Sequence, residues 1–210
     1  MKKGTGRIEA FSDGVFAIAI TLLVLDLRVP APGHFAEELL ADWTSYVAYL
    51  AAFLTIASIW LHHHSVFQHI ARVGPVVLLF NLLLLLGVSL VPWPTSLIAA
   101  AIRDGSRSDE VAAIVVYTIT SVLVSVAWAG VGFSLSRHPD FLLNADDARW
   151  MRVTGFQAML AAVPSLIAAA LSPFVPLVSL LIFLLVPLYF IAVTTISRRA
   201  PGAHGTADTR

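Results

Sequence analysis

The stretch Arg7 to Arg28, RIEAFSDGVFAIAITLLVLDLR, decides the fold because it places charged residues inside a segment long enough to cross a membrane. Its 22 residues extend over about 33 Å as a helix, which matches a hydrocarbon layer of roughly 30 Å. Only twelve uncharged residues separate Asp13 from Asp26, so at least one carboxylate of a spanning helix lies near or below the headgroups. A carboxylate at the centre of a membrane helix costs about 2.5 to 3.5 kcal/mol, so both must face protein or water. An ionisable residue inside a span indicates function.

The composition of the chain is typical of a multi-span membrane protein. Of its 210 residues, 58% are hydrophobic and 12% are charged, whereas soluble domains carry about 25% charged residues. The formal net charge is zero, so no basic surface suggests a nucleic acid partner. The absence of cysteine excludes disulfides, thiol nucleophiles, iron–sulfur clusters and thiolate zinc sites.

Apolar runs separated by polar or proline-rich breaks predict six membrane-spanning helices in one domain over residues 1–200. The third run contains Pro92-Trp93-Pro94, which predicts a kinked or broken helix. The 45 residues from Val153 to Ser197 carry no charge and are too many for one crossing, and the break from Ser172 to Pro176 divides them. Residues 201–210 predict a disordered tail. The expected spans cover about residues 7–28, 44–70, 75–102, 110–136, 152–171 and 175–197.

The distribution of Lys and Arg predicts the orientation of the helices. Six spans place both termini on one side, and that side carries ten of the 13 Lys and Arg residues, against Arg28, Arg103 and Arg107 opposite. Loops rich in Lys and Arg remain in the cytoplasm. We therefore expect an all-α integral membrane protein with both termini in the cytoplasm.

The histidines at the end of the second span have a functional and a structural interpretation. His62, His63, His64 and His69 could form a metal or haem site. Tandem histidines point about 100° apart on a helix, and only His62 and His69 come close to sharing a face. With no carboxylate or cysteine nearby, polar groups close to the interface are the plainer interpretation.

One face of the first span is aliphatic. Ile18, Leu22, Leu25 and Val29 follow the helical spacing i, i+4, i+7, i+11 and form a stripe. In an ordinary membrane helix such a stripe meets lipid or a neighbouring helix. The carboxylates on the same helix make a pore-lining role more plausible, because something on this helix has to reach water or a polar partner.

Motifs in the first half of the chain resemble the transmembrane protein 175 family of potassium channels. Arg7 to Asp13, RIEAFSD, matches the RxxxFSD signature of that family, and Trp60 to His63, WLHH, matches its W-x-x-H. Asn81 and the segment Pro92 to Leu97 are similar to the family's Asn and P-x-x-x-S-L pattern in the third span. The last three spans match only in number and hydropathy. One six-span unit per chain resembles the prokaryotic members, which assemble as homotetramers.

This resemblance implies roles for individual residues. In the family, the first span of each subunit lines a pore on the oligomer axis. Its narrowest aliphatic ring carries over to Ile18, with further rings at Leu22 and Leu25, and Thr21 matches a hydroxyl position that contributes to cation preference. Other motif residues match a structural network that fixes the first span against its neighbours, namely Arg7, Phe11, Ser12, Asp13, Trp60 and His63.

The resemblance implies a leak-type potassium channel, weakly selective over sodium, with a hydrophobic constriction on the first span. Its expected partners are further copies of the chain in a homotetramer, the lipid bilayer of a bacterial plasma membrane and potassium ions, without a cofactor, a resident metal or nucleic acid. An alternative is a proton- or cation-coupled secondary transporter that uses Asp13, Asp26 and the histidines as a relay. An intramembrane enzyme or haem protein is a further alternative, although we expect the chain not to be an enzyme.

Overall fold

The protein is described by a computed structural model over residues 5–174; the span expected at 175–197 and the tail expected at 201–210 lie outside the described residues. Within residues 5–174 the chain is helical apart from short connections and one isolated bridge between Ile70 and Leu142. The expected all-α membrane fold is confirmed by five segments in this part that are long and apolar enough to cross a membrane: Gly6–Asp26, Trp43–Phe67, Pro75–Asp104, Arg107–Arg137 and Asp147–Leu171.

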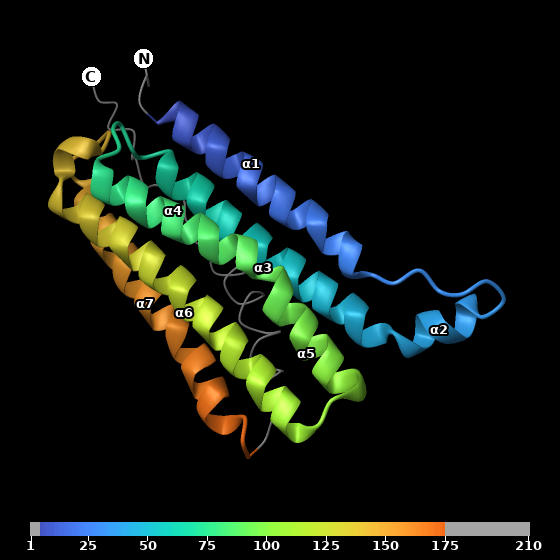
Figure 1. The fold of residues 1–210 in the computed structure, drawn as a ribbon. Coiled ribbons are helices and arrows are strands. Elements are labelled where there is room, and N and C mark those ends of the chain that lie inside the picture. The colour runs from blue at the N-terminus through green and yellow to red at the C-terminus, as the bar shows by residue number, and fades with distance from the viewer. Residues whose placement is uncertain (1–4, 175–210) are drawn as a thin grey trace, which may run out of the picture.

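The long helices run side by side in one bundle (Figure 1). The first helix, α1, packs on α3 and α4, while α6 packs on α4, α5 and α7, so that α1 and α7 lie on opposite sides of the bundle (Figure 1). The elements are α1 (Gly6–Leu22), the 3-10 turn η1 (Leu23–Asp26), α2 (Phe35–Ala41), α3 (Trp43–Phe67), α4 (Pro75–Leu90), α5 (Pro92–Asp104), α6 (Arg107–Arg137), the 3-10 turn η2 (Pro139–Phe141) and α7 (Asp147–Leu171).

The third span is broken where its prolines predict a break. Helix α4 ends at Leu90 and α5 starts at Pro92, where the missing N–H of proline leaves backbone carbonyls without their usual donors. Thr95 Oγ1 donates to the Val91 carbonyl at 2.6 Å and Ser96 Oγ donates to the Pro92 carbonyl at 3.0 Å. The Val91 carbonyl also accepts from the Thr95 N–H at 3.4 Å, so the hydroxyls add second donors in the first turn of α5. The Val88 carbonyl, four residues before Pro92, accepts from the Val91 N–H at 3.2 Å instead, which satisfies it at membrane depth.

Two connections differ from the sequence-based expectation. The α-helical part of the first span ends at Leu22, and a 3-10 turn continues it to Asp26 before the chain becomes extended. The acidic segment with Glu37 and Glu38, expected as a loop, forms the short helix α2, which projects from the bundle at the end opposite the N-terminus (Figure 1). None of the residues of α2 is buried, so local helix propensity rather than packing accounts for it.

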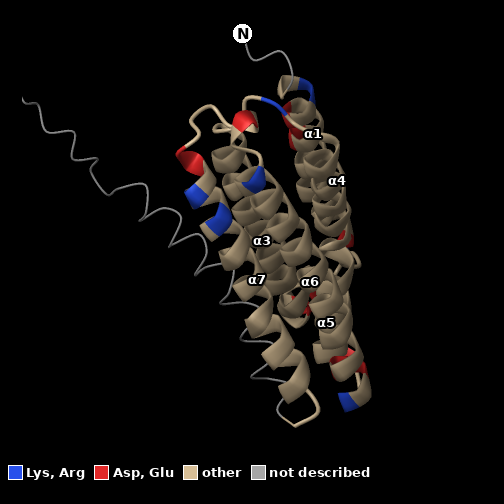
Figure 2. Ribbon diagram, turned by 90° about the vertical axis from the view of Figure 1, so that its left-hand side faces the viewer, with Lys and Arg blue, Asp and Glu red and all other residues tan. Residues whose placement is uncertain are grey.

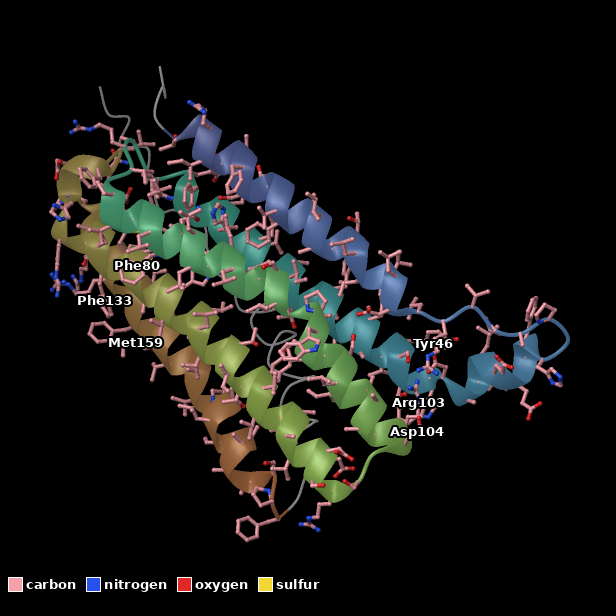
Figure 3. The ribbon with its side chains drawn as sticks, viewed as in Figure 1. Tyr46, Phe80, Arg103, Asp104, Phe133 and Met159 are labelled. Atoms are coloured by element: carbon pink, nitrogen blue, oxygen red, sulfur yellow. The ribbon has the colours of Figure 1, made fainter. Side chains whose placement is uncertain are left out.

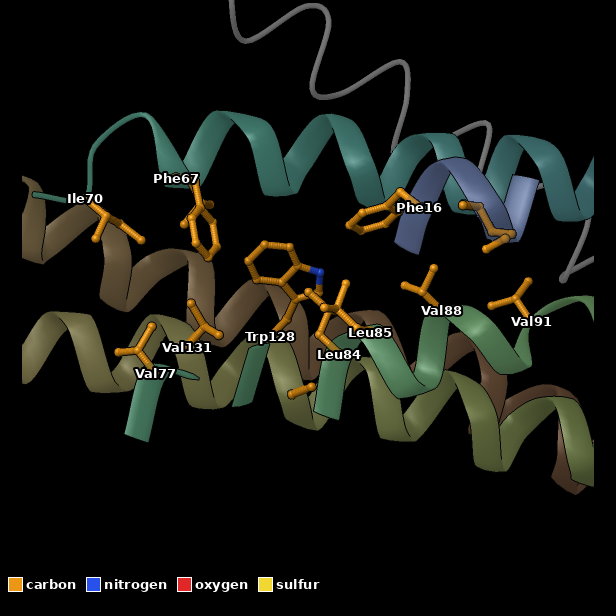
Figure 4. Packing of buried hydrophobic residues seen from close by; sticks show 14 of the residues in the cluster. Phe16, Phe67, Ile70, Val77, Leu84, Leu85, Val88, Val91, Trp128 and Val131 are labelled. Atoms are coloured by element: carbon orange, nitrogen blue, oxygen red, sulfur yellow. The ribbon is translucent and has the colours of Figure 1, made fainter. Parts of the chain in front are cut away.

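Trp128 of α6 lies at the centre of the buried cluster (Figure 4). Around it pack Phe16 from α1, Phe67 from α3, Leu84 from α4 and Val131 from α6. Inside a bilayer, lipid tails are as apolar as these side chains, so close van der Waals contact rather than exclusion of water holds them together. Met151 of α7 belongs to the same cluster, which therefore joins five helices and fixes one side of α1 against the bundle.

Charged residues lie mainly at the ends of the bundle. Lys and Arg gather at the end that holds the N-terminus, which the charge asymmetry assigns to the cytoplasm (Figure 2). At the opposite end, Arg103 Nη1 contacts Asp42 Oδ1 at 2.6 Å, with side chains 22% and 15% exposed, and so joins the end of α5 to the start of α3.

Candidate functional site

Helix α1 has two faces of opposite character. One face carries the buried residues Ser12, Phe16 and Ala19, and Leu23 of η1 continues it. The other carries large apolar side chains that touch little of their own chain: Phe11 is 57% exposed, Ile18 60% and Leu22 51%, and Leu25 of η1 is 74% exposed. Val29, which helical spacing placed in the same stripe, lies outside the helix because the helical turns end at Asp26. Within a membrane, such an exposed apolar face meets either lipid or another helix.

The residues expected to line a pore all lie on this exposed face. Ile18, Leu22 and Leu25 follow one another along α1 and η1, and Thr21 lies beside them. The Thr21 hydroxyl donates to the Ile18 carbonyl at 3.0 Å, so its proton is used within the helix and its oxygen lone pairs are left to accept. Val24 is also 52% exposed, so the exposed arc of η1 is wider than the stripe alone.

A buried amide joins α1, α3 and α4. Asn81 of α4 is fully buried, and its Nδ2 donates to Ser12 Oγ of α1 at 3.1 Å. Asn81 Oδ1 lies 3.0 Å from Nε2 of the buried His63 of α3. Because this amide oxygen can only accept, Nε2 of His63 carries the proton. One asparagine therefore satisfies polar groups on both neighbouring helices.

The His63 ring is held by aromatic neighbours. It stacks on Phe67 with ring centroids 4.0 Å apart and meets the edge of Phe16 at 5.4 Å. These contacts fix the plane of the imidazole and aim Nε2 at Asn81. The hydrogen bond to Asn81 and the packing of the ring in the apolar cluster therefore both hold His63 in place, at the same depth of the bundle.

A second, more exposed contact joins α1 to α3. Trp60 Nε1 donates to Asp13 Oδ1 at 2.9 Å, and the indole stacks on His64 with centroids 5.6 Å apart. Asp13 itself is exposed. Its carboxylate therefore has one protein donor and access to the surroundings, which avoids the cost of an unpaired charge in lipid.

The structure brings together only part of the expected network. Ser12 and His63 meet through Asn81, and Asp13 meets Trp60. Arg7 is exposed and, within residues 5–174, makes no hydrogen bond or ion pair. Phe11 lies on the exposed face of α1 instead of in the network.

Two polar contacts of this site were not predicted from the sequence. One is the contact of Asn81, which stands out in the sequence as a single amide residue within an apolar run. The other lies at the opposite end of the span, where Asp26 Oδ2 accepts a hydrogen bond from Ser96 Oγ of α5 at 2.7 Å. Asp26, Arg28, Ser96 and Arg103 line a cavity of about 220 Å³ between η1, α3 and α5. Asp26 is thus provided with a protein partner, as its depth requires.

His62 of α3 and His69, two residues beyond the end of α3, contact different neighbours. His62 meets the edge of Trp128 at 4.7 Å, whereas the His69 ring lies 4.8 Å from Trp150. In the part of the chain that the structure describes, no three His, Cys, Asp or Glu residues are grouped so that they could hold a metal ion.

The chain is similar to proteins that are named as channels. A family model described as "Endosomal/lysosomal potassium channel TMEM175" matches residues 7–92. A protein of Streptomyces collinus named as a potassium channel is 46% identical over 136 residues, which are 63% of this chain and 65% of that protein. A Rattus norvegicus protein named "Endosomal/lysosomal proton channel TMEM175" is 34% identical over 136 residues, which are 58% of this chain and 27% of that protein.

A solved structure extends the similarity to most of the fold. The crystal structure of a lysosomal potassium-selective channel TMEM175 homolog from Chamaesiphon minutus superposes with a TM-score of 0.73 at 32% sequence identity. The match covers 90% of this chain and 97% of that one, whereas the aligned segments span less than two thirds of the Streptomyces and rat proteins. Motifs, helix arrangement and sequence identity agree, and the chain belongs to the TMEM175 family.

Proposed function

We propose that this chain is one subunit of a potassium channel in which α1 lines a pore on the axis of a homotetramer. The observation that carries the proposal is the exposed aliphatic face of α1, since Ile18, Leu22 and Leu25 are each more than half exposed. The opposite face is already fixed by Asn81 and the apolar cluster. Copies of α1 around an axis would bring the exposed faces together, and the bacterial relative named as a potassium channel supports the choice of ion.

Permeation in this arrangement is controlled by a hydrophobic constriction. Aliphatic side chains that converge on an axis exclude water, and a dewetted ring blocks ions without a charged barrier. Ile18 forms the narrowest ring, with Leu22 and Leu25 towards the outside. Thr21 offers oxygen lone pairs beside this ring, which is a weak cation-selective element compared with rings of backbone carbonyls. We therefore propose a leak-type conductance with weak selectivity for potassium over sodium.

The name of the rat relative favours a second candidate, the conduction or coupled transport of protons. Asp13 is an exposed carboxylate on the proposed pore helix, and His63 lies in the neighbouring network. A proton relay requires titratable groups that reach water. This candidate includes the secondary transporter that the sequence left open.

The experiment is a flux assay on the full-length protein reconstituted in liposomes loaded with potassium. Membrane potential and internal pH are followed with separate dyes, and sodium replaces potassium outside. Ile18→Asn should hydrate the ring, raise potassium flux and bring sodium flux close to it. Leu160→Asn is the matched control, because Leu160 is an aliphatic residue, 66% exposed, on α7 at the far side of the bundle.

Each outcome separates the candidates. Potassium flux above that of protein-free liposomes, altered by Ile18→Asn and not by Leu160→Asn, supports the proposal. A pH change with no potassium flux favours the proton candidate, and no flux of either ion refutes both. Native mass spectrometry tests assembly, and a protein that stays monomeric or dimeric at working concentration excludes a pore on a fourfold axis.

A further inference from the structure

The cytoplasmic ends of α6 and α7 are in a register that places two arginines next to each other. The helices approach closely at Gly132, where a Cβ would lie 2.7 Å from the Gly155 nitrogen. Beside this point the rings of Phe133 and Phe156 meet edge to face with centroids 5.1 Å apart. Arg137 lies one helical turn from Phe133 on α6, and Arg152 lies one helical turn from Phe156 on α7. In both helices this turn is on the side of the connecting loop. The two guanidinium groups therefore extend from neighbouring positions.

Neither arginine has an acidic partner among the residues that the structure describes. Arg137 and Arg152 are exposed, and neither makes an ion pair or hydrogen bond with any residue between 5 and 174. The nearest loop carboxylate in sequence, Asp140, lies 3.7 Å from Arg72 instead. Asp146 and Asp147 precede Arg152 on the chain, but neither lies within the 4.0 Å of an ion pair with it. Two neighbouring positive charges without a counter-charge favour an anion between them.

The face that leads from these arginines into the membrane is apolar and exposed. Phe156 is 56% exposed and Met159, one turn deeper on α7, is 53% exposed. Figure 3 shows Phe133 and Met159 on the same outer side of the bundle, and Figure 1 places this side away from α1. It lies at the end where Lys and Arg gather (Figure 2). A single phospholipid would place its phosphate at the two arginines and an acyl chain along this face.

We propose that Arg137 and Arg152 form a binding site for the phosphate of an anionic phospholipid of the cytoplasmic leaflet, with an acyl chain lying against Phe156 and Met159. Guanidinium groups bind phosphate oxygens through two parallel hydrogen bonds, which a lysine ammonium cannot do. Basic sites between transmembrane helices on the cytoplasmic side are suited to lipid headgroups. The site is independent of ion conduction, because it lies on the side of the bundle opposite α1 (Figure 1).

The test measures lipid binding to the full-length protein in detergent by native mass spectrometry, with phosphatidylglycerol as the anionic probe and phosphatidylcholine as the neutral one. The parent should retain phosphatidylglycerol in preference to phosphatidylcholine. The affinity for phosphatidylglycerol should fall about fivefold for Arg137→Gln or Arg152→Gln and about 30-fold for the double variant. Arg28→Gln, an exposed arginine at the opposite end, is the control and should bind like the parent.

Two further variants keep the test decisive. Arg137→Lys with Arg152→Lys preserves the charge and should recover only part of the lost affinity, because the fork geometry is gone. If the double glutamine variant does not fold, the single variants carry the comparison. Phe156→Ala should lower the affinity for phosphatidylglycerol. The protein should still prefer phosphatidylglycerol to phosphatidylcholine by the same factor.

Three results with the lipids would overturn the proposal, and a fourth comes from competition with phosphate. They are equal binding of the two lipids by the parent, an unchanged affinity in both single glutamine variants, and a loss in Arg28→Gln as large as in Arg152→Gln. Inorganic phosphate in excess should not displace the lipid, because it lacks the acyl chain. Full displacement would identify a site for a free anion and refute the lipid.

Discussion

Replacing Asn81 with leucine should loosen α1 from the bundle, because Asn81 hydrogen-bonds both Ser12 of α1 and His63 of α3. Leucine has a similar volume, so the change removes polar contacts without leaving a large cavity. Two hydrogen bonds between membrane helices contribute on average about 0.6 kcal/mol each. The buried Nε2–H of His63 then has no acceptor, which costs a further 1 to 3 kcal/mol or so. We expect the free energy of unfolding to fall by about 2 to 4 kcal/mol.

The assay is equilibrium unfolding of the full-length protein in mixed micelles, followed by circular dichroism as the denaturing detergent is increased. Ser89→Ala is the matched control on the same helix, because Ser89 Oγ is exposed and donates only to the Leu86 carbonyl one turn earlier. It should change the free energy by less than about 0.5 kcal/mol. A double-mutant cycle of Asn81→Leu with Ser12→Ala should give an interaction energy above about 0.5 kcal/mol. If Asn81→Leu unfolds like the parent or like Ser89→Ala, the network does not hold α1.

Three further predictions use the same unfolding assay. Trp60→Phe removes the indole donor to Asp13 but keeps an aromatic ring, and it should cost less than about 1 kcal/mol because the contact is exposed; a loss as large as that of Asn81→Leu would contradict this. Gly132→Val should destabilise by at least about 1 to 3 kcal/mol, since its side chain would overlap the Gly155 backbone, whereas tolerance would show that α6 and α7 can separate. Ser106→Ala removes the capping box at the start of α6 and should cost about 1 kcal/mol, with Ser106→Asp as the variant that retains the cap.

Local features of the fold could be predicted from the sequence because they depend on neighbours along the chain. The exposed stripe of Ile18, Leu22 and Leu25 follows from helical spacing. The break before Pro92 follows from the missing N–H of proline.

Contacts between distant residues could not be predicted in this way. Asp26 and Ser96 are 70 residues apart, and Arg103 and Asp42 are 61 apart, so no periodicity relates them. The sequence required that Asp26 face protein or water, but several hydroxyls would have met that requirement. For Arg7 the motif predicted a place in the network, whereas the side chain is exposed.

The two polar contacts of the first span bear on how the proposed pore would change its width. Ser12 is tied to Asn81 near the cytoplasmic end, and Asp26 is tied to Ser96 near the outer end. Ile18 lies between these two hydrogen bonds. While both persist, α1 does not slide or rotate relative to its own bundle, and Ile18 moves relative to it by a change of side-chain rotamer or by bending of the segment between Ser12 and Asp26. Opening by rotation of the whole helix would first have to break one of these hydrogen bonds.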